Sequence, residues 1–121
     1  MILPKLFAAA VLFAASPILA HEGPGPNGGR IEEGSGFHVE LVTKDGRLDV
    51  YLSDAAEKAV PAEGYKGTAI FVVDGKPARI VLEPAQGNRL SGSAKGQIAA
   101  DAKGAVRLTQ PDGKTASVSF H

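Results

Sequence analysis

Alternation of apolar and polar side chains is the most regular feature of the chain. In 37–43 and in 48–53 every second residue is apolar, which is the pattern of a β-strand with one face in a core. The connection between them contains Asp45-Gly46, a dipeptide typical of two-residue hairpin turns. The pattern therefore predicts a β-hairpin. Its inward side chains are Phe37, Val39, Leu41, Leu48, Val50 and Leu52.

Strand patterns of the same kind recur over the rest of the chain. Two further Asp-Gly pairs, at 74–75 and 112–113, predict hairpin turns. The other strands are predicted at 30–33, 68–73, 76–82, 89–92, 105–109 and 115–120. Residues 54–67 fit two interpretations. Asp54 could cap a single helical turn, or a short edge strand could run up to Pro61.

These segments amount to seven or eight short strands at spacings of roughly 8–12 residues, and no segment has a convincing helical period. The fold expected over 31–121 is all-β, an immunoglobulin-like β-sandwich. A small β-barrel is the alternative, because strand patterning alone separates the two architectures poorly. In the sandwich, the start of the second strand and the end of the last strand lie at one end. That arrangement would bring His38 near His121.

Residues 21–30, with the sequence HEGPGPNGGR, interrupt the strand pattern. Proline lacks an amide hydrogen and glycine loses the most backbone entropy on folding, so neither a helix nor a central strand suits this segment. We expect a flexible, extended arm that precedes the β domain.

The first twenty residues differ in composition from the rest. Lys5 is the only charged residue before Glu22, and ten consecutive apolar residues follow it. Residues 1–20 thus combine a charged start, an apolar stretch of signal-peptide length and a small residue, Ala20, at the cleavage position. An uncleaved membrane anchor is the alternative, but a spanning helix needs about 20 apolar residues. We expect export to the periplasm and a soluble mature chain that begins at His21 and does not insert into the membrane.

Composition argues against several classes of function. The chain has no cysteine, which rules out disulfides, thiolate nucleophiles and cysteine-ligated metal sites. Thirteen basic residues balance thirteen acidic ones, whereas nucleic-acid-binding proteins usually carry a basic excess, so we expect no nucleic-acid partner. Neither a Gly-x-Ser-x-Gly elbow nor a phosphate-binding glycine loop occurs. We therefore expect that the protein is not an enzyme.

Histidine is the residue type that remains for metal chemistry. Cleavage after Ala20 would leave His21 with a free α-amine beside its imidazole, and the two nitrogens form a chelating pair for a divalent cation. Met1 is the only methionine and leaves with the signal peptide. Nitrogen and oxygen ligands then favour Cu(II) or Zn(II) over soft cations.

Further candidate ligands lie on the strand at 37–43 and at the chain end. His38 and Glu40, two residues apart, share the side of the strand predicted to face solvent. His121 follows the inward Phe120 and should point outward. The expected metal ligands are His21, His38, His121 and Glu40, with Glu22 as a weaker candidate. The alternative function is a structural or protein-interaction module without a metal.

The arm and the strand after it resemble a known segment. Residues 21–31 read HEGPGPNGGRI, and 37–41 read FHVEL. They resemble the N-terminal segment of periplasmic adaptor subunits of heavy-metal efflux pumps of the resistance-nodulation-division type, and small exported proteins related to it. Those segments typically read His-x-Gly-Pro-Asn-Gly-Gly followed by an aromatic-His-x-Glu-Leu strand. Residues 88–92 and the closing strand at 113–120 look similar too.

The resemblance implies a periplasmic β-sandwich in metal-cation homeostasis or resistance, with a metal-efflux component as its partner. His21 and His38 match positions of the motif, whereas His121 lies outside it. The chain lacks the helical hairpin, lipoyl-like and barrel parts through which adaptors contact a pump. It also lacks the histidine- and methionine-rich stretches that some relatives carry.

Overall fold

The computed structural model describes residues 24–121. The predicted signal peptide, residues 1–20, lies outside them, as do the candidate ligands His21 and Glu22.

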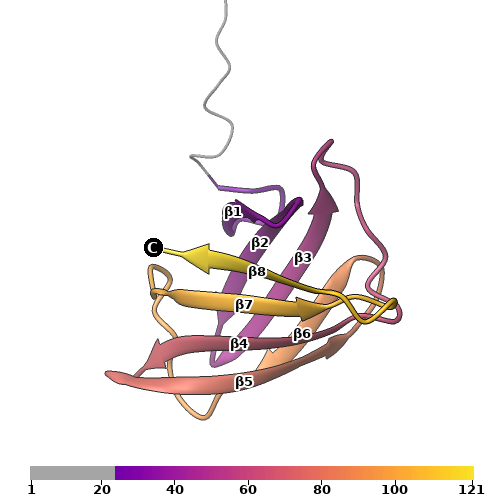
Figure 1. The fold of residues 1–121 in the computed structure, drawn as a ribbon. Helices are drawn as coiled ribbons and strands as arrows, with labels where there is room; N and C mark the ends of the chain where they lie inside the picture. The colour runs from indigo at the N-terminus through magenta and orange to yellow at the C-terminus, as the bar shows by residue number, and fades with distance from the viewer. Residues whose placement is uncertain (1–23) are drawn as a thin grey trace, which may run out of the picture.

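Eight β-strands make up the described part of the chain, and all of them match predicted segments (Figure 1). They are β1 (Arg30–Gly34), β2 (Phe37–Lys44), β3 (Arg47–Asp54), β4 (Lys66–Val73), β5 (Lys76–Pro84), β6 (Arg89–Ser93), β7 (Gly104–Thr109) and β8 (Thr115–Phe120). The all-β prediction is therefore confirmed.

The strands form one antiparallel sheet in the order β1-β2-β3-β6-β5-β4-β7-β8. In Figure 1 strands β8, β7, β4 and β5 cross in front of β2 and β3 at a steep angle, so the sheet curves round on itself. The immunoglobulin-like sandwich is not confirmed, because β5 pairs with both β4 and β6 and so joins the two halves. The architecture is a nearly closed, barrel-like sheet, which agrees with the alternative left open by the sequence.

Tight turns set the register of the hairpins. Asp45 and Gly46 both have positive φ, 50° and 77°, as a type I′ turn requires, and Lys44 pairs directly with Arg47. Asp74 and Gly75 repeat this geometry between β4 and β5. The third Asp-Gly pair lies in a longer turn, in which the Gln110 amide donates to the Lys114 carbonyl at 2.8 Å.

One continuous core fills the inside of the curved sheet. Alternate residues of every strand from β2 to β8 contribute to it, as the two-residue period requires. The predicted inward set is confirmed, with Phe37 only partly buried at its edge. The largest fully buried side chains are Phe71, Phe120, Leu48, Leu52, Ile80, Leu82, Leu90 and Leu108.

Strands β1 and β8 close the sheet through side chains and not through a backbone ladder. The Ser35 hydroxyl donates to the Ser117 carbonyl at 3.3 Å and accepts from the Ser117 amide at 3.2 Å. At the other end of the seam, the Arg30 guanidinium donates to the carbonyls of Ala102 at 2.6 Å and His121 at 3.2 Å. Each backbone group of the seam therefore depends on one side chain.

We expect Ser35→Ala to loosen this seam locally. The substitution removes both contacts with Ser117, and each ordinary hydrogen bond contributes about 0.5–1.5 kcal/mol to stability. Hydrogen exchange of the Ser117 amide should accelerate several-fold, since its acceptor is gone. Ser119→Ala in β8 is the matched control and should leave that amide unchanged. Equal exchange in both variants would show that Ser35 does not hold the seam.

Candidate functional site

The outer face of β1, β2 and β3 carries the candidate ligands of the described chain. His38 and Glu40 point away from the core, on the opposite face from Val39 and Leu41, as alternation predicts. Their predicted solvent exposure is wrong, because His38 is only 9% exposed and Glu40 only 5%. Two segments, 25–29 and 54–60, cover this face and exclude water from both side chains.

Glu40 anchors the first of these covering segments. Its Oε2 accepts hydrogen bonds from the backbone amides of Asn27 and Gly29, each at 2.8 Å, and its Oε1 accepts one from the Asn27 side-chain amide at 2.9 Å. The Gly25 amide donates to the Gly29 carbonyl at 2.7 Å and closes the turn. The part of the expected arm that the structure describes is thus a turn docked on β2 and not an extended chain.

Gly29 allows this close docking. A Cβ atom at this position would lie 2.2 Å from the Leu41 carbonyl oxygen, far inside contact distance. The turn therefore approaches the β2 backbone more closely than any residue with a side chain permits.

Asp54 shapes the second covering segment. Its Oδ1 accepts hydrogen bonds from the amides of Ala56 and Lys58, each at 2.9 Å, and its own amide donates to the Lys58 carbonyl. The chain then returns beside β3, where the Val60 amide donates to the Leu52 carbonyl at 3.0 Å. Both interpretations of this segment were partly right, since Asp54 caps a turn and a single bridge follows, but neither a helix nor a strand forms.

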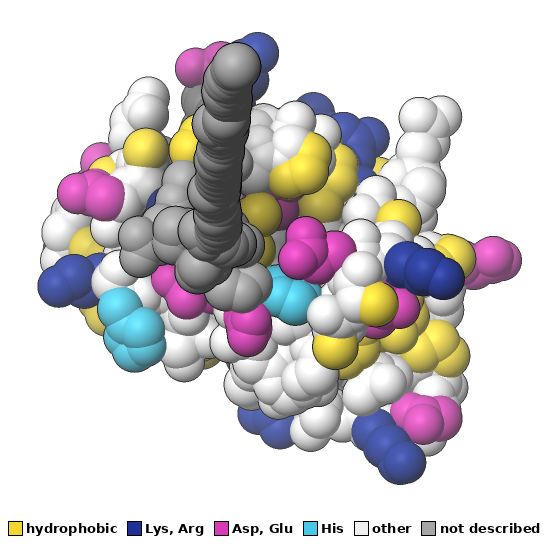
Figure 2. All heavy atoms as spheres, turned by 90° about the horizontal axis from the view of Figure 1, so that it is seen from above, with side chains coloured by type: hydrophobic (Ala, Val, Ile, Leu, Met, Phe, Trp, Pro, Cys, Tyr) yellow, Lys and Arg dark blue, Asp and Glu magenta, His cyan; other side chains and the backbone are white. Residues whose placement is uncertain are grey.

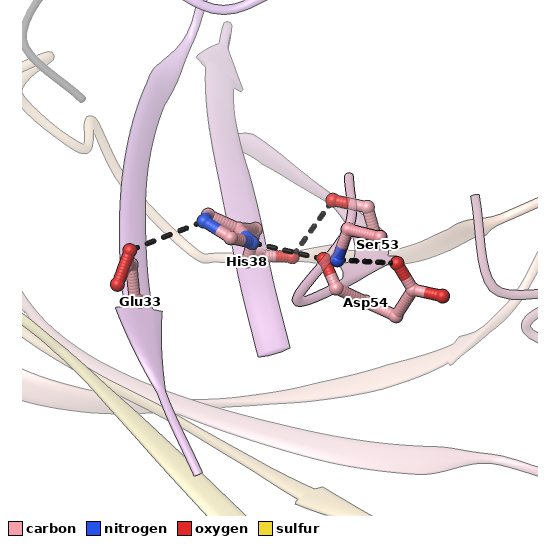
Figure 3. A network of polar contacts seen from close by, with 5 residues as sticks. Glu33, His38, Ser53 and Asp54 are labelled. Carbon is pink, nitrogen blue, oxygen red and sulfur yellow. Dashed lines mark hydrogen bonds and ion pairs between the residues drawn. The ribbon is translucent and has the colours of Figure 1, made fainter. Parts of the chain in front are cut away.

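His38 is held on both sides of its ring (Figure 3). Nδ1 lies 2.9 Å from the Asp54 backbone carbonyl oxygen, and Nε2 lies 3.2 Å from Oε2 of Glu33. A carbonyl oxygen can only accept, so Nδ1 carries a hydrogen. In the neutral ring Nε2 therefore has the lone pair, and in the imidazolium form it donates to Glu33.

A pocket of about 240 Å³ lies between the two covering segments, above β2 and β3. Its lining is mostly polar and includes His38, Glu40, Tyr51, Ser53, Glu57 and Asn88. Figure 2 shows histidine and acidic side chains next to one another near the middle of this end of the molecule. The pocket is thus a small polar hollow on the outer face and not a cavity within the core.

The Nε2 and Oε2 atoms of His38 and Glu33 have the spacing of two ligands of one cation. With a Zn–N distance of about 2.0 Å and a Zn–O distance of about 2.1 Å, a 3.2 Å separation corresponds to an angle of roughly 100° at the metal, close to tetrahedral. A metal-ligating histidine usually donates its other nitrogen to a carbonyl or carboxylate, as Nδ1 does here to Asp54.

The four expected ligands do not come together in the described residues. Within 24–121 no group of three or more histidine, aspartate or glutamate side chains is placed to hold a metal ion. Glu40 could coordinate only by giving up its bonds to the turn at 25–29. His121 lies beside Arg30, which pairs with Leu41, three residues along β2 from His38. The expected proximity of His38 and His121 is wrong, because β1 lies between β2 and β8.

Glu33 was missed as a candidate because its strand was not paired. Gly34-Ser35-Gly36 marked a connection in the sequence, without a register. A two-residue turn at Ser35-Gly36 pairs Gly34 with Phe37 and therefore places Glu33 directly opposite His38. The turn chemistry was thus the signal that leads to the pair.

Comparison with protein-family models, with curated proteins and with solved structures finds no match to this chain. Residues 24–121 contain no helix long and apolar enough to cross a membrane. The arguments about function therefore rest on the chemistry of the chain's own residues.

Proposed function

We propose that this protein is a non-enzymatic metal-binding protein that takes up or delivers a divalent transition metal, Cu(II) or Zn(II). The single observation that carries the proposal is the pair formed by His38 and Glu33. Nε2 and Oε2 lie 3.2 Å apart, and the ring is oriented by the Nδ1 bond to the Asp54 carbonyl. A nitrogen and a carboxylate oxygen so arranged suit both cations.

The pair supplies two ligands, and the N-terminus is the proposed source of the others. Cleavage after Ala20 would give His21 a free α-amine and an imidazole, which completes four ligands. His21 precedes the turn at 25–29, which Glu40 holds against β2. Glu40 would then be a positioning residue and not a ligand. His121 has no part in this proposed site.

Export and partnership belong to the same proposal. The charged start, apolar stretch and Ala20 of residues 1–20 support secretion to the periplasm. The resemblance of 21–31 and 37–41 to efflux-adaptor segments supports a partner in a metal-efflux system. A mass for the exported chain that corresponds to a start at His21 is expected, and any other start would remove the amine ligand.

The alternative is a structural or interaction module without a metal. It is favoured by the imidazolium form of His38, which would donate to Asp54 and Glu33 at once and satisfy both acceptors. Under this alternative the pair stabilises the β1–β2 hairpin and shields the outer face.

Calorimetric titration of the chain that begins at His21 with Cu(II) and with Zn(II) separates the two. We expect micromolar or tighter binding of at least one metal, and His38→Gln and Glu33→Gln should each weaken it at least tenfold, because each removes a ligand. His121→Gln is the matched control and should leave the affinity unchanged. One extra residue before His21 should also weaken binding, since it displaces the α-amine.

The outcomes discriminate clearly. If neither metal binds at micromolar concentration, the proposed function is wrong and the metal-free module stands. If binding survives both His38→Gln and Glu33→Gln, the metal lies elsewhere and the pair is structural. If the added residue changes nothing, His21 does not supply the anchoring amine.

A further inference from the structure

A second outer face, formed by β5, β4, β7 and β8, has the opposite chemical character from the metal-site face. Among residues 24–121, these four strands contain one acidic residue, Glu83. Their basic residues are Lys66, Lys76, Arg79 and Arg107. We call the part of this face around Lys66, Arg79 and Arg107 the cationic face.

Strand register gathers these cations around one hydroxyl. Thr68 on β4 lies directly opposite Arg107 on β7. Arg79 on β5 lies opposite Ile70, the next residue of β4 on the same face, and Lys66 is the preceding one. Cross-strand and diagonal neighbours on one face are within reach of long side chains. Three basic side chains therefore surround Thr68.

A groove runs across this face. A hollow of about 580 Å³ is lined by the three cations and by hydroxyl side chains, and no acidic residue lines it. Its hydroxyl residues are Thr68, Thr109, Thr115 and Ser117. A neighbouring hollow of about 590 Å³ shares Lys66, Thr68 and Arg79 with it, so the two continue into one another across β4 and β5.

The cations of this face lack acidic partners within the described chain. The ion pairs found there join Glu33 to His38 and Asp49 to Arg47 and Arg89, all on the other half of the sheet. Positive charge without a neighbouring carboxylate raises the local potential and attracts an anionic partner. The two halves of the sheet thus differ in charge compensation as well as in composition.

Exposed aliphatic side chains lie on the same face. Ile70 is 52% exposed, Val72 43% and Val81 60%, and they are the exposed large hydrophobic residues of the described chain. Ile70 lies opposite Arg79, and Val81 lies opposite Thr68, so the apolar and cationic positions alternate across the groove. A bare inorganic anion would leave these aliphatic side chains in water, whereas a peptide can cover them.

We propose that the cationic face docks an extended, acidic segment of a partner protein. Arg79 and Arg107 are separated by β4, a lateral distance of about 10 Å at the usual strand spacing. Carboxylates three residues apart on an extended chain are also about 10 Å apart. A segment with two acidic residues in that spacing and aliphatic residues between them would pair with both arginines while it covers Ile70. Arginine binds carboxylates through two parallel hydrogen bonds, which gives such contacts direction.

Fluorescence anisotropy of a labelled peptide tests the proposal. The probe is a 12-residue peptide with two glutamates three residues apart and valine between them, and its control has glutamine in place of glutamate. We expect the intact protein to bind the glutamate peptide at least tenfold more tightly, and higher salt should weaken the binding. Arg79→Gln combined with Arg107→Gln should weaken it at least tenfold.

Matched variants decide whether the face itself recognises the peptide. Lys44→Gln combined with Lys95→Gln removes the same charge at two exposed positions outside the face and should change affinity less than twofold. Ile70→Ser should weaken binding several-fold, since the aliphatic contact is lost. Equal loss in both double variants would indicate unspecific charge attraction and overturn the proposal. Tighter binding to anionic phospholipid vesicles than to the peptide would overturn it in favour of a membrane surface.

Discussion

Phe120→Ala should lower the free energy of unfolding by about 3–5 kcal/mol, although Phe120 is the penultimate residue of the chain. The side chain is 1% exposed, and its ring centroid lies 5.8 Å from that of Phe71 in a tilted contact. The Arg30 guanidinium lies over the same ring at 5.4 Å. Alanine would leave a cavity between β8 and β4 and would remove the contact that holds Arg30 at the seam. Urea denaturation of both proteins, followed by circular dichroism, measures the loss.

Val72→Ala is the control for this prediction. Val72 is 43% exposed on β4, so its truncation should cost less than about 1 kcal/mol, because most of its surface is already in water. A domain of this size typically has only about 5–15 kcal/mol of stability, so Phe120→Ala alone should bring it close to unfolding at physiological temperature. If Phe120→Ala were no more destabilising than Val72→Ala, the C-terminal strand would not be part of the cooperative core.

Glu40→Ala should cost about 3 kcal/mol and should release the turn at 25–29 from β2. The substitution leaves the amides of Asn27 and Gly29 without their acceptor, and the Gly29 position is buried. Hydrogen bonds to a charged group contribute about 1.5–3 kcal/mol, and a buried donor left without a partner costs a similar amount. Hydrogen exchange at both amides, together with urea denaturation, measures the local and the global effect.

Two further variants show whether the carboxylate or merely the shape of Glu40 matters. Glu40→Gln keeps an oxygen that can accept from the two backbone amides, so it should retain the turn and lose only part of the stability. Glu83→Gln changes an exposed carboxylate on β5 and should have no measurable effect. Unchanged exchange at Asn27 and Gly29 in Glu40→Ala would contradict the anchoring role. If the metal proposal holds, Glu40→Ala should also weaken metal binding, because it frees the N-terminus.

The positions and faces of the strands were open to prediction because their causes are local. Alternation in 48–53 assigns each side chain to a face, and Asp45-Gly46 adopts the positive φ values that a tight hairpin needs. Glu33 could have been found in the same way from the turn at Ser35-Gly36. The candidate site was accessible from sequence only as far as such nearest-neighbour pairings extend.

The environment of His38 and Glu40 was not open to prediction, because alternation says which face a residue takes but not what covers it. Two irregular segments cover this outer face, and neither has a periodic pattern. Their positions depend on single contacts, those of Glu40 with Asn27 and Gly29 and those of Asp54 with its own loop. Contacts of this kind join residues that no repeating pattern relates.

By itself the sequence determined eight strands, their inward faces and the tight turns, since each follows from side-chain period and backbone preference over a few residues. Only the tertiary structure decided that β5 bridges the two halves into one curved sheet, that β1 separates His121 from His38, and that Glu33 and Asp54 hold the His38 ring. The reason is that strand order and covering loops are settled by how the whole core closes, and many closures share the same local pattern.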